Sequence, residues 1–168
     1  MIKIKQNKSW LPDYMAESVV QIDADELRKA AITHLVFDLD NTLLIHKTNE
    51  LSAETVAYIA GLRQAGFKII LGSNTRRDTD AVVEAMQGKG VRVRGLSMKP
   101  FKSYYKKVIA AAETEPEHIA MIGDHLINDV IGANRAGLKT ILVKSLSRRT
   151  LTFNAAYIQW LKKYAQKT

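Results

Sequence analysis

Residues 34–43 read His-Leu-Val-Phe-Asp-Leu-Asp-Asn-Thr-Leu, and this stretch decides the fold. An apolar run at 34–37 stops at Asp38, and a second carboxylate, Asp40, follows two residues later. A short apolar run that does not alternate with polar residues is typical of a strand buried on both faces. The sequence therefore predicts a buried strand over 34–37 whose carboxyl end carries two acids.

The same pattern recurs along the chain, because apolar runs alternate with longer segments of helical periodicity. We expect strands over 34–37, 67–71, 91–96, 118–122 and 140–143. We expect helices over 52–64, 76–87, 101–113 and 127–136. Apolar strands separated by helices predict an α/β fold, with a parallel sheet of about five strands covered by helices on both faces.

Polar residues stand where the predicted strands end. Asp38, Ser73 and Asp124 each follow an apolar run, and Lys99 lies in the loop after the third predicted strand. In open parallel sheets the ligand binds outside the carboxyl ends of the strands. We therefore expect these four side chains to meet around one crevice.

The crevice would gather several carboxylates, which repel one another and require a counter-ion. The candidates are Asp38, Asp40, Asp124 and Asp129. Hard oxygen ligands of this kind suit Mg²⁺. Lys99 adds a positive charge, and Ser73 and Asn74 add hydrogen bonds. An anion site built over a metal is what phosphoryl transfer requires.

Composition fits one globular domain spanning 1–168, with a core over about 30–145. The chain is 46% hydrophobic and 25% charged, and it contains no cysteine, which excludes disulfides, zinc-thiolate sites and cysteine nucleophiles. No apolar run reaches the length of a membrane span, and no apolar segment follows the N-terminal lysines as in a secretory signal. These features favour a cytoplasmic protein.

The net charge of +8 comes from the two ends of the chain. Residues 1–10 carry three lysines and residues 148–168 carry five bases, both without an acid, while the remaining residues are balanced. This distribution argues against recognition of nucleic acid by a broad basic surface, and it favours peripheral docking on an anionic membrane.

A helix is predicted over about 150–166, with four aromatic residues on one face. They are Phe153, Tyr157, Trp160 and Tyr164. The stripe is consistent with packing on the domain, packing on a second subunit, or an interfacial helix at a membrane. The sequence leaves these three alternatives open.

Four motifs in chain order resemble the haloacid-dehalogenase (HAD) superfamily of phosphatases. Residues 37–43 resemble its DxDxT motif, Ser73-Asn74 its second motif, Lys99-Pro100 its third, and 123–129 its fourth, GDxxxND. The resemblance covers about 11–143. It implies a Rossmann-like three-layer core, a phosphorylated substrate and a Mg²⁺ cofactor.

The resemblance also implies a role for each motif residue. Asp38 would attack phosphorus to form an aspartyl-phosphate, and Asp40 would act as general acid and base. Ser73 and Lys99 would hold the phosphoryl oxygens. Asp124 would bind the metal together with Asp38, the Asp40 carbonyl and Asp129.

Two further residues are candidates for binding the substrate. Asn74 stands beside Ser73, and Arg76 follows it at the start of the predicted helix over 76–87. Arg76 is expected either to contact an anionic head group or to be an ordinary solvated arginine.

The intervals between the motifs leave no room for the cap domain that the superfamily inserts over small substrates. We therefore expect an open, capless crevice that suits a phosphate on a large carrier, or an oligomer in which a neighbouring subunit forms the lid.

A narrower resemblance is to the YqeG-type subclass IIIA, which includes phosphatidylglycerophosphate phosphatases. It is carried by Leu11-Pro12-Asp13 and by 132–143. A lipid-linked substrate is therefore expected. A soluble sugar, nucleotide or phosphoprotein substrate, or a non-catalytic binding protein on the same fold, are the alternatives.

Overall fold

Strand β3 (His34–Phe37) is at the centre of the fold, between β4 (Lys68–Gly72) and β6 (Ile119–Gly123). A computed structural model describes residues 1–4, 9–44, 50–75, 78–91, 98–147, 159 and 163. Phe37 pairs with Leu71 on one side and with Ile122 on the other, so the three strands end at the same level. All four residues of β3 are buried, as its apolar sequence predicts.

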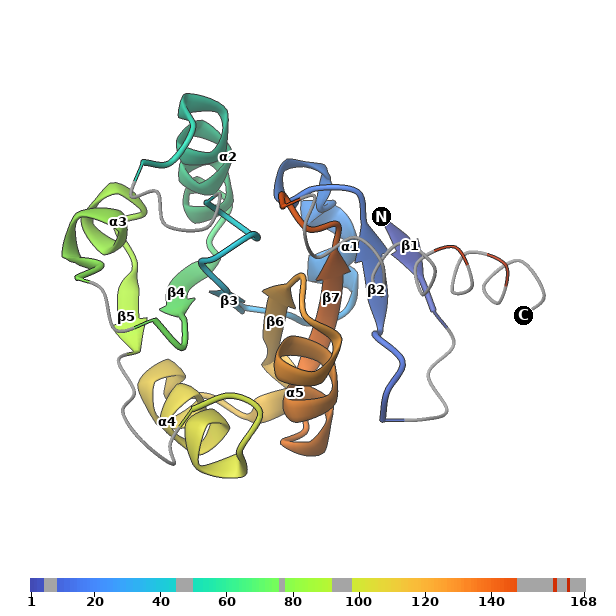
Figure 1. The fold of residues 1–168 in the computed structure, drawn as a ribbon. Helices are drawn as coiled ribbons and strands as arrows, with labels where there is room; N and C mark the ends of the chain where they lie inside the picture. The colour runs from blue at the N-terminus through green and yellow to red at the C-terminus, as the bar shows by residue number, and fades with distance from the viewer. Residues whose placement is uncertain are drawn as a thin grey trace.

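Among the described residues, the sheet has seven strands in the order β1-β2-β7-β6-β3-β4-β5 (Figure 1). The outer strands are β1 (Ile2–Lys3), β2 (Tyr14–Ala16), β7 (Lys139–Val143) and β5 (Lys89–Val91). Every neighbouring pair is parallel except β1 with β2. The α/β class and the parallel sheet are confirmed. The expected count of about five strands is too low, because β1 and β2 are too short to leave an apolar run in the sequence.

Helices cover both faces of the sheet, which makes three layers (Figure 1). The helices are α1 (Ala24–Lys29), α2 (Ala53–Gln64), α3 (Asp80–Ala85), α4 (Lys102–Ala112) and α5 (Gly132–Arg135). Leu35 and Phe37 of β3 belong to the core shared with α1, α2 and α3, whereas Val36 belongs to the core shared with α4 and α5. The alternation of side chains along each strand thus supplies both cores.

Most element boundaries agree with the sequence to within a residue or two, with local differences. The helix expected over 76–87 is shorter, since α3 spans only Asp80–Ala85. The helix over 52–64 begins at its expected cap, since the Thr55 N–H donates to Ser52 Oγ at 3.1 Å. The segment expected to be helical over 127–136 is a π-helix (Leu126–Ile131) followed by α5. The strand expected over 91–96 begins earlier, at Lys89, and its remainder lies outside the described residues. The helix predicted over about 150–166 also lies outside them, apart from two single residues.

The N-terminal segment is attached to the sheet by a buried polar network. The Asp13 N–H donates to Thr140 Oγ1 at 3.0 Å, and the Thr140 N–H donates to Asp13 Oδ2 at 2.9 Å. Asn134 accepts from the Thr140 hydroxyl at 3.0 Å and donates to the carbonyl of Leu11 at 2.7 Å. These bonds align β2 beside β7, because Asp13 immediately precedes β2.

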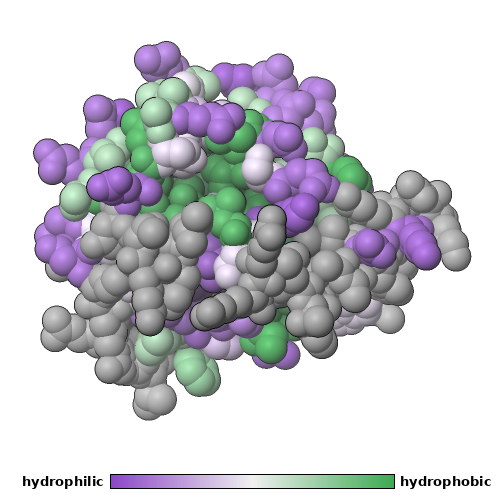
Figure 2. Space-filling view, turned by 45° about the horizontal axis from the view of Figure 1, so that its top comes forward, coloured by the Kyte–Doolittle hydropathy of each residue, from purple (hydrophilic) through white to green (hydrophobic). Residues whose placement is uncertain are grey.

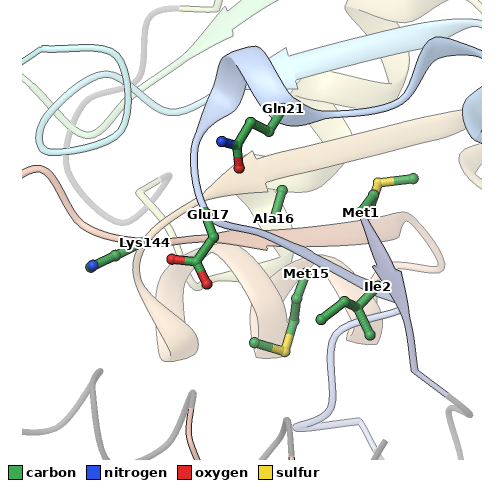
Figure 3. Close-up of a pocket in the computed structure, with 7 residues that line it drawn as sticks. All are labelled: Met1, Ile2, Met15, Ala16, Glu17, Gln21 and Lys144. Atoms are coloured by element: carbon green, nitrogen blue, oxygen red, sulfur yellow. The ribbon is translucent and has the colours of Figure 1, made fainter.

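A small hollow of about 100 Å³ lies at this side of the sheet (Figure 3). It is lined by Met1, Ile2, Met15, Ala16, Glu17, Gln21 and Lys144. Residues of β1 and β2 therefore lie next to Lys144, which follows β7. Among the described residues, no helix is long and apolar enough to cross a membrane.

We expect Thr140→Val to lower the free energy of unfolding by about 1–3 kcal/mol, because it removes the hydroxyl and leaves the buried Asp13 N–H without its acceptor. Urea denaturation followed by circular dichroism measures the change. Thr114→Val, at a half-buried position outside this network, is the control. Equal stability of the two variants would contradict a structural role for the network.

Candidate active site

A hollow of about 370 Å³ opens at the carboxyl ends of the central strands. Within the part of the chain that the structure describes, the lining residues are all polar or charged: Asp38, Asp40, Asn41, Ser73, Asn74, Thr75, Lys99, Asp124, His125, Asn128 and Asp129. Every site residue expected from the sequence is in this set except Arg76, which lies outside the described residues. The sheet thus brings together side chains that are up to 91 positions apart in the chain.

Strand register explains why three of these residues meet. Asp38 follows β3, Ser73 follows β4 and Asp124 follows β6, and the three strands end at the same level. The Asp38 N–H continues the ladder and donates to the carbonyl of Ile122 at 2.8 Å. The main chain therefore positions Asp38 independently of the contacts that its side chain makes.

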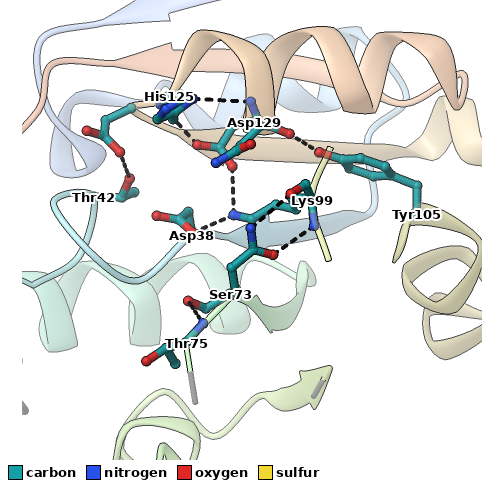
Figure 4. A network of polar contacts seen from close by, with 11 residues as sticks. Asp38, Thr42, Ser73, Thr75, Lys99, Tyr105, His125 and Asp129 are labelled. Carbon is teal, nitrogen blue, oxygen red and sulfur yellow. Dashed lines mark hydrogen bonds and ion pairs between the residues drawn. The ribbon is translucent and has the colours of Figure 1, made fainter. Parts of the chain in front are cut away.

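The ammonium of Lys99 is at the centre of the polar network (Figure 4). It forms ion pairs with Asp38 and, at 2.7 Å, with Asp129. The ring of Tyr104 lies beneath it, with 5.9 Å from Nζ to the ring centroid. Lys99 is only 4% exposed, so its charge depends on these partners rather than on water.

Burial and charge act in opposite directions on the pKa values here. Burial raises the pKa of Asp38 to about 6, with the charge of Asp129 adding to the rise and Lys99 opposing it. Burial alone would lower the pKa of Lys99, but Asp129 and Asp38 outweigh it and hold that pKa well above its usual value. The lysine therefore stays charged, while Asp38 shares one cation with a second acid.

Asp129 holds the loop after β6 as well as the lysine. Its Oδ2 accepts from the His125 N–H at 3.0 Å, and His125 Nδ1 in turn accepts from the Asn128 N–H at 3.2 Å. The Asp129 carboxyl packs against Gly123, where an added Cβ would lie 2.3 Å from Asp129 Cγ. Only glycine at this position allows the carboxyl to reach Lys99.

Asp124 is oriented by two hydroxyl groups that motif reasoning gave no role. Thr42 donates to Asp124 Oδ1 at 3.3 Å, and a hydrogen bond from Ser145 stabilises the ionised form. Burial nevertheless raises the pKa of Asp124. Thr42 belongs to the first motif, so its presence near the site could have been inferred. Ser145 follows β7, and no signal in the sequence points to it.

The side chain of Asn74 lines the hollow and also forms hydrogen bonds with the main chain of Lys99. Its Nδ2 donates to the Lys99 carbonyl at 3.0 Å, and its Oδ1 accepts from the Lys99 N–H at 2.7 Å. The adjacent Ser73 Oγ accepts from the Thr75 N–H at 3.2 Å. The loop after β4 is therefore joined directly to the segment that carries the lysine.

Three buried carboxylates could hold a metal ion. Oxygen atoms of Asp38, Asp124 and Asp129 all lie within 4.8 Å of one another. Lys99 supplies one positive charge against these three acids. An all-oxygen cluster with excess negative charge fits a hard divalent cation. Asp40 lines the same hollow but is not part of this cluster.

Comparisons with known proteins agree with this geometry. The family model described as HAD-hydrolase-like matches residues 97–156. Over 137 residues the chain is 27% identical to the probable phosphatase YqeG of Bacillus subtilis, covering 81% of this chain and 78% of that protein. It is 25% identical to phosphatidylglycerophosphate phosphatase 1 of Arabidopsis thaliana, covering 96% of this chain and 48% of that protein.

Solved structures support the fold. A haloacid dehalogenase-like hydrolase from Brucella suis superimposes with a TM-score of 0.59 at 12% identity, covering 81% of this chain and 97% of that one. A Vibrio cholerae structure described as that of a "putative 3-deoxy-D-manno-octulosonate 8-phosphate phosphatase" gives a TM-score of 0.50 at 17% identity, covering 83% of this chain and 90% of that one. With the four motif segments gathered at one edge of the sheet, the chain is similar in sequence to HAD-like hydrolases and to the probable phosphatase YqeG, and its fold is that of a haloacid dehalogenase-like hydrolase.

Proposed function

We propose that this protein is a Mg²⁺-dependent phosphatase that hydrolyses a phosphomonoester through an aspartyl-phosphate on Asp38. The observation that carries the proposal is the buried Lys99 ammonium, paired with Asp38 inside a cluster of three carboxylates. A nucleophile, a fixed cation and a divalent-cation site in one hollow are the components that phosphoryl transfer needs.

In the first step, a carboxylate oxygen of Asp38 attacks phosphorus and the bond from phosphorus to the leaving oxygen breaks. Asp40, which lines the same hollow, gives its proton to that oxygen. Lys99 has three N–H donors, of which two face Asp38 and Asp129. The third is available for a phosphoryl oxygen, which Ser73 also binds.

In the second step, water attacks the phosphorus of the aspartyl-phosphate and Asp40 accepts the proton of that water. Phosphate leaves and the Asp38 carboxylate is restored. Mg²⁺ would be held by Asp38, the Asp40 carbonyl and Asp124, with Asp129 supporting the site, and it would neutralise charge on the transferred group. Thr42 and Ser145 would keep Asp124 in the ionised form that binds the cation.

For the substrate, we propose a phosphate group on a lipid-linked carrier. The polar and charged residues that line the described part of the hollow suit the phosphate and the metal. Large exposed hydrophobic side chains lie near the site residues in sequence: Phe101 two residues after Lys99, and Ile127 three residues after Asp124. Leu146 is a third exposed hydrophobic residue. Its N–H donates to the carbonyl of Asn41, which lines the hollow.

The surface at this end of the molecule is consistent with such a substrate. Figure 2 tilts the top of Figure 1 toward the viewer and shows hydrophobic residues gathered in the upper middle of the visible face, with hydrophilic residues above them and at the sides. Exposed apolar groups beside a phosphate site favour an amphiphilic carrier and peripheral contact with an anionic membrane. The Arabidopsis relative named above as a phosphatidylglycerophosphate phosphatase supports this substrate class.

A phosphate-release screen tests the proposal. We expect hydrolysis of an aryl phosphate with Mg²⁺ and none after chelation by EDTA, with recovery on adding Mg²⁺ back. Short-chain phosphatidylglycerophosphate is compared with soluble sugar, nucleotide and phosphoprotein substrates. Hydrolysis without a divalent cation would contradict the metal requirement, and a clear preference for a soluble phosphoester would contradict the lipid-linked substrate.

We expect Asp38→Asn to lower phosphate release more than about a thousandfold, because the nucleophile is lost. In the metal-free protein its melting temperature at neutral pH should not fall. The raised pKa of Asp38 means that its carboxyl favours the folded state below its usual pKa of 3.8, and that this contribution is lost as pH rises through about 6. Turnover at the wild-type rate would exclude Asp38 as nucleophile.

We expect Gly123→Ala to lower kcat by about 100-fold, because the new Cβ displaces the Asp129 carboxyl and with it Lys99. The matched control is Gly61→Ala in α2, where an added Cβ meets nothing within 4 Å. Steady-state kinetics on an aryl phosphate measures both. Equal kcat values in the two variants would mean that the position of Asp129 does not matter to the reaction.

A further inference from the structure

We propose that Asn74 is a positioning residue that acts on the reaction through Lys99, rather than a residue that binds the substrate. The inference rests on the proposed phosphatase function and adds to it how the lysine is held in place. The position of Asn74 next to Ser73 in the sequence predicts a substrate-binding role for it instead.

The geometry is a pair of hydrogen bonds that run in opposite directions. Nδ2 of Asn74 donates to the Lys99 carbonyl at 3.0 Å, and Oδ1 accepts from the Lys99 N–H at 2.7 Å. A side-chain amide carries a donor and an acceptor side by side, so it pairs with both main-chain groups of one residue as a neighbouring strand would. Aspartate lacks the donor, and alanine lacks both groups.

This pair connects the two loops that supply the phosphoryl-binding groups. Ser73 and Asn74 follow β4, whereas Lys99 precedes α4 by three residues. Holding the Lys99 main chain against Asn74 therefore sets the distance between the serine hydroxyl and the lysine ammonium. The Lys99 side chain is 2% exposed and lies between two carboxylates, so a shift of its main chain cannot be absorbed by a new rotamer in solvent.

A direct role for Asn74 would use the second N–H of its amide, and a double-mutant cycle separates the two roles. The probe is orthovanadate with Mg²⁺, and its dissociation constant is measured by calorimetry for wild type, Asn74→Ala, Lys99→Met and the double variant. We expect Asn74→Ala to weaken binding about tenfold in the wild-type background and not at all in the Lys99→Met background. Additive losses would show that Asn74 contacts the ligand itself and would overturn the inference.

A second measurement does not depend on activity. Hydrogen exchange of the Lys99 amide, followed by NMR, should be slow in the wild type and much faster in Asn74→Ala, because that N–H loses its acceptor. Thr140→Val is the control for a general loss of stability, because it is expected to destabilise the fold away from the site. It should leave the affinity for vanadate unchanged.

The outcomes distinguish this inference from the proposed function. If the wild-type chain releases no phosphate from any substrate, the proposed function fails whatever the exchange rates are. If the wild type is active and Asn74→Ala retains both its vanadate affinity and a slow Lys99 amide, the positioning role fails alone.

Discussion

The buried ammonium of Lys99 requires the surrounding loops to place carboxylates next to it. A charge removed from water is stable only when an opposite charge lies close to it, and Lys99 has two such partners. Asp38 comes from the end of β3 and Asp129 from the π-helix after β6. The ion pairs therefore tie together segments that the sheet only brings near one another.

Stability and reactivity are opposed at this cation. Asp38 shares it with Asp129 and has a raised pKa, so the folded chain carries a carboxylate that burial disfavours. Such a group is available as a metal ligand, because a divalent cation would relieve the repulsion that the protein alone leaves uncompensated. Two residues keep Lys99 and Asp129 in place. Gly123 has no side chain and so leaves room for the Asp129 carboxyl, and the amide of Asn74 holds the main chain of Lys99.

Much of the fold and the grouping of the candidate site residues in one hollow could be predicted from the sequence, because both depend on a local pattern: an apolar run followed by a polar residue. Asp38, Ser73 and Asp124 follow this rule, and the strand register then brings them together. What could not be predicted depends on distant pairs. The partner of Asp124 at Ser145 and the attachment of β2 to β7 leave no pattern along the chain, since each joins residues that only the folded topology makes neighbours.

The strands at the two edges of the sheet have a consequence for self-association. Strand β2 covers one side of β7, and the described sheet ends on β1, with two residues, and β5, with three. Each of these edge strands contains a lysine, Lys3 in β1 and Lys89 in β5. Short edges that carry a charge are poor templates for pairing with another chain. As far as the chain is described, the buried central strands, which are apolar enough to aggregate if exposed, lie inside a sheet whose edges resist pairing with another chain.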